Sequence, residues 1–190
     1  MAKRVFILLL VGLCFVFIPG IQAKELKGVS FPEEKVIAGK TLTLNGVALR
    51  KALGFIKVFA GGFYLETPTT DSTVAIESEQ VKYFYLEYLT NKATAKKLQD
   101  GFLESIAKAN PAKLVEAQQK NIELYASWLD QDMKPGGTSE SIYEPGKGLT
   151  LIINGQTKGT ITDVTFAQMY YRYSLGEKAD KKLRKGYLGL

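Results

Sequence analysis

One stretch of the sequence constrains the fold more than any other, because it is apolar on both of its faces. It reads LRKALGFIKVFAGGFYLE and runs from Leu49 to Glu66. A strand that is apolar on both sides must be covered on both sides, so the pattern predicts one long central strand of a large sheet. Glycine weakens a strand, so the Gly61-Gly62 pair indicates a bend, or the close approach of a helix or a ligand.

The first residues match a secretory signal peptide. Two cations, Lys3 and Arg4, precede an apolar run from Val5 to Ile18, and the segment ends on the small residue Ala23. A membrane-spanning helix needs about 20 apolar residues, so cleavage after Ala23 is favoured over an uncleaved anchor. We therefore predict a signal peptide over 1–23, one domain over 24–190, and a periplasmic or secreted location.

The composition excludes several classes of function. The chain has no histidine, and its single cysteine, Cys14, lies in the predicted signal peptide. Serine–histidine catalysis and histidine–metal sites are therefore excluded, and the predicted domain has no disulfide. The formal charge of +6 falls to +4 without Lys3 and Arg4, which is too mild to indicate nucleic-acid binding. We predict no metal and no cofactor.

The rest of the chain alternates between two hydrophobic periods. Short apolar runs separated by turn residues predict strands, and apolar residues at helical spacing predict helices. Strands joined by hairpins imply an antiparallel sheet covered by helices, which is an α+β architecture. The expected order is a turn at Asn45-Gly46, the long strand, strands over 73–76 and 83–89, helices over 94–109 and 111–129, strands over 141–143, 149–153 and 160–162 with a turn at Asn154-Gly155, a helix capped by Asp163, and a basic helix over 180–187.

Arg50 is the strongest candidate for a binding residue. It follows the apolar segment NGVAL and precedes a strand that is expected to be buried, so its guanidinium is expected near the sheet surface. A buried arginine needs a partner, because an unpaired buried charge costs several kcal/mol. The partner is either an internal carboxylate, such as Glu66 or Glu87, or the anionic group of a ligand held through two parallel hydrogen bonds.

Two further groups of residues have an ordinary structural explanation beside a functional one. The cations near the C-terminus could contact anionic lipid, although such a run is more often the solvated face of a helix. The tyrosines could line a pocket, but aromatic residues at such spacing are usually core. The cations are Lys178, Lys181, Lys182, Arg184 and Lys185, and the tyrosines are Tyr83, Tyr85, Tyr170, Tyr171 and Tyr173.

Four segments together resemble the bacterial chalcone isomerase-like family. They read GVSFPE, LNGVALRKALGFIKVFAGGFYLE, YEPGKGLTLIINGQTKGTI and FAQMYYRYSLGEKADKKLRKGYLG, and they occur in this order along nearly the whole predicted domain. The resemblance implies an open-faced β-sandwich, in which a large antiparallel sheet is covered by a layer of helices with a ligand cleft between them. The wider superfamily includes enzymes that close chalcones to flavanones and relatives that bind fatty acids. In both, an arginine before the long strand faces the anionic oxygen of the ligand, and Arg50 matches it.

The other positions implied by the resemblance depart from the enzymes. Phe59 stands where the enzymes have a threonine and where the fatty-acid binders tend to have a tyrosine. The tyrosine, lysine and asparagine of the following helix align with Thr94, Lys97 and Gly101, so only the lysine is retained. Loss of one donor to a developing oxyanion costs about 10²–10³-fold in rate. Flavonoid cyclisation is therefore not expected, and no catalytic residue is assigned.

Three functions stay open on the sequence. The leading hypothesis is an exported, non-catalytic binder of a small apolar acid such as a fatty acid, with ligand-binding residues Arg50, Phe59, Lys97 and Thr94. The second is an intramolecular lyase or isomerase in which Arg50 stabilises charge and Lys97 acts as acid or base. The third is a structural or partner-binding domain whose cleft is filled by its own side chains. The sequence does not determine the oligomeric state.

Overall fold

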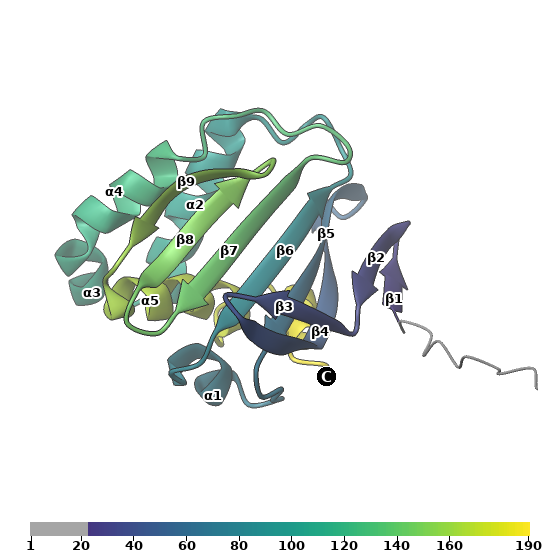
Figure 1. Ribbon diagram of the computed structural model, residues 1–190. Coiled ribbons are helices and arrows are strands. Elements are labelled where there is room, and N and C mark those ends of the chain that lie inside the picture. Colours follow the sequence, from purple (N-terminus) through teal and green to yellow (C-terminus); the bar gives the residue numbers. More distant parts are fainter. Residues whose placement is uncertain (1–22) are drawn as a thin grey trace, which may run out of the picture.

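A computed structural model of the protein describes residues 23–190, so the predicted signal peptide lies outside the described residues except for Ala23. Its centre is a seven-stranded antiparallel sheet whose strands follow one another in chain order (Figure 1). A separate two-stranded hairpin precedes the sheet. The hairpin is β1 (Ala23–Leu26) and β2 (Val29–Pro32), and the sheet is β3 (Glu34–Ile37), β4 (Lys40–Ala52), β5 (Ile56–Leu65), β6 (Lys82–Tyr88), β7 (Thr138–Glu144), β8 (Gly148–Ile153) and β9 (Gln156–Ile161).

The helices form a layer on one face of this sheet (Figure 1). Between residues 23 and 190, no helix combines the length and apolarity needed to cross a membrane. The helix layer and the antiparallel sheet confirm the predicted α+β architecture. The helices are α1 (Ser72–Glu77), α2 (Ala95–Ala109), α3 (Ala112–Ala117), α4 (Gln119–Ser127), α5 (Val164–Leu175) and α6 (Lys181–Tyr187).

The prediction of one long strand from Leu49 to Glu66 is wrong, because the chain turns back in the middle of the stretch. Leu53 and Gly54 both have positive φ, +50° and +76°, and together with Phe55 they form the short turn that connects β4 to β5. Such left-handed pairs match the twist of antiparallel strands. The predicted turn at Asn45-Gly46 is also wrong, since these residues lie inside β4 at a β-bulge.

Two helix predictions need correction. The segment over 73–76, expected as a strand, lies in α1, because the Asp71 carboxylate accepts hydrogen bonds from the amides of Thr73 and Val74 and starts a helix. The single helix expected over 111–129 is divided into α3 and α4 at Gln118, whose ψ of 12° leaves the helical range. The Gln118 side-chain amide donates to the Asp163 carboxylate. Asp163 is the N-cap of α5, as predicted.

The glycine pair of β5 lies where both faces of the sheet are covered. A Cβ atom on Gly61 would overlap the hydroxyl of Tyr187 from α6, and one on Gly62 would overlap the ring of Phe31 from β2. Neighbouring residues of a strand point to opposite faces. The helices therefore cover the Gly61 face and the β1–β2 hairpin covers the Gly62 face, which explains why this strand is apolar on both sides.

Candidate functional site

Arg50, Phe59 and Tyr88 form a row across three neighbouring strands. Arg50 of β4 pairs with Phe59 of β5, and Phe59 pairs with Tyr88 of β6. Residues directly opposite one another in antiparallel strands point to the same face. The rings of Phe59 and Tyr88 meet edge to face with centroids 5.7 Å apart. The register thus places one cation beside two aromatic rings on the helix-covered face.

The partner of Arg50 is a carboxylate that the sequence did not single out. The Arg50 guanidinium donates to the Asp180 carboxylate at 2.9 Å, and the two side chains are 41% and 40% exposed. Arg50 is therefore half-buried rather than buried, and neither Glu66 nor Glu87 is its partner. The Glu66 carboxylate accepts from the amide of Val81, and Glu87 accepts from the hydroxyl of Tyr85.

Helix α6 covers the sheet behind Arg50. Tyr187 is 2% exposed, and its ring meets that of Phe84 edge to face at 4.8 Å. Asn45 fixes the same, C-terminal end of the helix, because its side-chain amide donates to the Tyr187 carbonyl at 2.7 Å. The backbones of Gly46 and Gly186 lie so close that a Cβ atom on either would overlap the other segment. The protein's own side chains thus occupy the sheet face next to Arg50.

The hydroxyl groups at this site are held in their neutral form. Burial raises the pKa of Tyr88 to about 12. Burial also raises the pKa of Tyr187 far above its usual range, and the charge of Arg50 opposes this only partly. A neutral tyrosine hydroxyl can donate a hydrogen bond to an anion. Arg50 at the edge of these neutral aromatic side chains suits an anionic group attached to an apolar body.

The other two predicted site residues lie at the start of α2. Thr94 is its N-cap, and its hydroxyl accepts from the Lys97 amide. The Lys97 ammonium donates to the Lys92 carbonyl at 3.2 Å and is exposed. No hydrogen bond or ion pair in residues 23–190 joins either side chain to Arg50. The structure therefore brings Arg50 and Phe59 together and gives Thr94 and Lys97 local roles.

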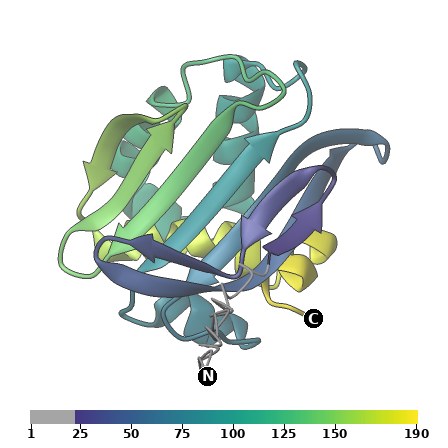
Figure 2. The same cartoon turned by 45° about the vertical axis from the view of Figure 1, so that its right-hand side comes forward.

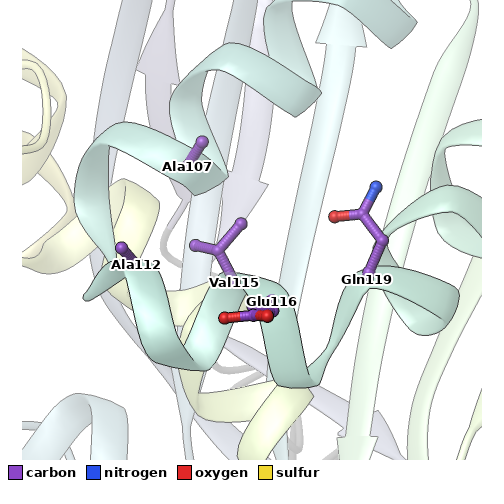
Figure 3. A pocket seen from close by; sticks show the side chains of 5 residues that line it. All are labelled: Ala107, Ala112, Val115, Glu116 and Gln119. Atoms are coloured by element: carbon purple, nitrogen blue, oxygen red, sulfur yellow. The ribbon is translucent and has the colours of Figure 1, made fainter.

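A groove of about 400 Å³ lies on the helix layer, away from Arg50. Figure 3 shows it between α2 and the α3–α4 pair. No cation lines it, and the Gln119 amide at its border donates to Glu123. It lacks a counter-charge for an acid, so it is a weaker candidate than the Arg50 row. Its lining residues are Ala107, Ala112, Val115, Glu116 and Gln119.

In a comparison with protein families, residues 23–189 of the chain match the chalcone isomerase-like family. The chain belongs to the chalcone isomerase-like family. A search of curated proteins finds no match. Among solved structures, a fatty-acid binding protein of Arabidopsis thaliana is similar, with a TM-score of 0.70 and 18% sequence identity over 88% of this chain and 96% of that one. At this identity the likeness shows a shared fold, and the large sheet under helices is the chalcone isomerase-like fold.

Sequence reasoning missed Asp180, Tyr88 and Tyr187 as members of the site. Asp180 lies in the family-like ending LGEKADKKLRKGYLG, so that ending was an available signal for it. Tyr88 could not be found in the same way, because its position beside Phe59 depends on the register of β5 against β6.

Proposed function

We propose that the protein binds a small apolar carboxylic acid, such as a fatty acid, and that Arg50 holds its carboxylate. The observation that carries the proposal is the row of Arg50, Phe59 and Tyr88, which sets a half-exposed guanidinium at the edge of an aromatic surface. The structurally similar plant protein is described as a fatty-acid binding protein, which supports the same ligand class here.

Asp180 occupies the place on Arg50 that a ligand carboxylate would take. Exposed ion pairs contribute only about 0–1 kcal/mol, so exchanging one carboxylate for another on Arg50 costs little. The apolar tail then needs part of the surface that Tyr187 covers, so binding requires α6 to move outward. Burial of the tail offsets that cost by up to about 0.8 kcal/mol per methylene.

Substitutions of Arg50 and of Asp180 should change the affinity for fatty acid in opposite directions. Arg50→Gln removes the charge-assisted hydrogen bond and should weaken fatty-acid binding at least about tenfold. Asp180→Asn removes the competing carboxylate and should tighten binding by up to about fivefold. Asparagine is also a good N-cap, so α6 keeps its first turn, where Asp180 accepts from the amides of Lys182 and Leu183.

Titration calorimetry with saturated fatty acids of increasing length measures both effects, and native mass spectrometry of the purified protein detects any lipid that it carries. Lys51→Gln is the matched control, because Lys51 is the exposed cation next to Arg50 and has no role in the row. If Arg50→Gln and Asp180→Asn weaken binding equally, the pair acts only as a structural link. If the wild-type protein binds no fatty acid, the proposal fails.

The close packing under α6 favours one second candidate, a structural or partner-binding domain with a filled cleft. Tyr187 of α6, Tyr171 of α5 and Phe84 of β6 are all buried between the helices and the sheet. Absence of ligand binding in the calorimetric experiment would support this candidate. Isomerase chemistry is less favoured, since Phe59 carries no hydroxyl, the Thr94 hydroxyl caps a helix, and Lys97 donates to a backbone carbonyl. Export, expected from the predicted signal peptide, stays part of the proposal.

A further inference from the structure

The tip of the β4–β5 hairpin exposes two large apolar side chains. Leu53 is 80% exposed and Phe55 is 74% exposed. Figure 2 shows the hairpin reaching beyond the rest of the sheet, with α6 beside it. Apolar residues gathered on a projecting tip cannot contribute to the core of the molecule. Such exposed groups often mark an interaction surface.

The requirements of the turn do not explain the leucine. Leu53 has a φ of +50°, in the left-handed region where a bulky side chain is unfavourable and where asparagine or glycine is preferred. An Asn-Gly pair would form the same turn with less strain. The chain thus retains an exposed leucine at a position where folding would favour a small polar residue, and this points to a role in binding.

Positive charge surrounds the two apolar side chains on several segments. Lys51 and Lys57 face each other across the hairpin, just below the tip, and both are exposed. The Arg50–Asp180 ion pair brings the beginning of α6 to the same place, and with it the exposed Lys181 and Lys182. Asp180 is already paired with Arg50. The surface is therefore an apolar wedge bordered by amines.

We propose that this hairpin tip docks on an anionic lipid bilayer, with Leu53 and Phe55 in the interface and the lysines on the headgroups. A convex wedge bordered by an excess of positive charge complements a flat, deformable, negatively charged surface. A groove on a protein partner would instead need a matched arrangement of acidic groups around an apolar pocket. The inference goes beyond ligand binding and does not depend on it, although docking here would place Arg50 near the membrane surface.

Co-sedimentation with lipid vesicles tests the proposal. The wild-type domain should bind vesicles of phosphatidylcholine containing phosphatidylglycerol at least about tenfold more tightly than vesicles of phosphatidylcholine alone, because the headgroup charge attracts the lysines. Added salt should weaken the binding by screening that attraction. No binding to the anionic vesicles, or equal binding to both kinds, overturns the proposal.

The variant Leu53→Asn/Phe55→Ser separates the wedge from the fold. It should lose about tenfold or more in affinity for the anionic vesicles, while its melting temperature stays equal or rises, because asparagine suits the left-handed turn. Val36→Ser is the matched control, because Val36 is 74% exposed but lies on β3, beside the end of β4 that is far from the hairpin tip. This variant should bind vesicles as the wild type does. Unchanged binding by the double variant, or an equal loss in the control, contradicts the wedge.

Discussion

At the scale of single residues, Lys82 is the most unusual side chain of the core. It is 2% exposed, and its ammonium donates to the Ile76 carbonyl at 2.6 Å. The same ammonium lies over the rings of Tyr143 and Tyr171, 5.3 and 5.1 Å from their centroids. Burial lowers the pKa of Lys82 from 10.5 to about 8, although nearby acidic side chains, Glu79 above all, oppose the shift. The folded state therefore disfavours the charged form of this lysine.

This shift predicts how stability depends on pH. Between about pH 8 and pH 10 the unfolded chain binds more protons at Lys82 than the folded chain, so the free energy of unfolding should rise with pH. Above about pH 10 it should fall, because unfolded tyrosines ionise there while burial keeps the folded ones, such as Tyr171, neutral. Urea denaturation at a series of pH values measures both the rise and the fall of the free energy of unfolding.

The variant Lys82→Met isolates the contribution of the lysine. Methionine has a similar apolar stem and no charge, so the rise between about pH 8 and pH 10 should become smaller while the fall at higher pH remains. Part of the rise should persist, because burial also lowers the pKa of Lys35. A wild-type stability that decreases steadily from pH 8 would contradict the assignment. A rise of unchanged size in the Lys82→Met variant would contradict it too.

At the scale of elements, the close packing of α6 on the sheet depends on glycines. Gly61→Ala should destabilise the protein, because the new Cβ overlaps the Tyr187 hydroxyl and the Leu86 side chain. We expect a loss of about 1–3 kcal/mol in the free energy of unfolding. Removing the hydroxyl in Gly61→Ala/Tyr187→Phe should recover part of this loss, and a double-mutant cycle by urea denaturation measures the coupling. Zero coupling would place Tyr187 away from Gly61.

Gly46 and Gly101 differ in the space around them, because Gly46 is packed against α6 and Gly101 has no atom close to its Cβ position. Gly46→Ala should displace α6, because its Cβ would overlap the backbone of Gly186, and a backbone cannot move as a side chain can. Gly101→Ala, on the exposed side of α2 with no atom near its Cβ, should stabilise the protein by about 0.5–1 kcal/mol. Thermal denaturation of the two variants should thus shift the melting temperature in opposite directions. Equal shifts would rule out the close contact of α6 with β4.

At the scale of the whole molecule, the sheet carries two separate apolar layers. The outer layer joins Phe31, Val29, Val47 and Ala60 under the β1–β2 hairpin, while the proposed ligand row lies on the helix face. Phe31→Ala should therefore lower the free energy of unfolding by about 3–5 kcal/mol but leave fatty-acid affinity unchanged. Denaturation and calorimetry on the same variant test this. A parallel loss of affinity would show that the two faces are coupled.

Local sequence signals predicted most of the helices, strands and turns correctly. The helix over 94–109, the Asp163 cap and the Asn154-Gly155 turn are observed where they were expected, because caps, turns and hydrophobic periods act over a few residues. The same reasoning failed at Leu53-Gly54, where the apolar alternation continued through a turn whose first residue is not a typical turn former.

Two residues of the candidate site could also be anticipated. Arg50 and Phe59 were proposed from the sequence and lie side by side, because both belong to one local hairpin. Tyr88 and Asp180 were not, since their positions depend on the register of β5 against β6 and on an ion pair that joins residues 130 positions apart. Such contacts are chosen by how whole surfaces pack, and no short pattern encodes them.

The sequence by itself determined an α+β chain of the chalcone isomerase-like family with an arginine at the start of its most apolar segment. The tertiary structure alone decided what lies against the Gly61-Gly62 pair. Tyr187 packs on one face and Phe31 on the other, and each comes from an end of the domain far from the pair in the chain. A glycine in a strand signals that something approaches closely, but only the packing of distant elements determines what approaches.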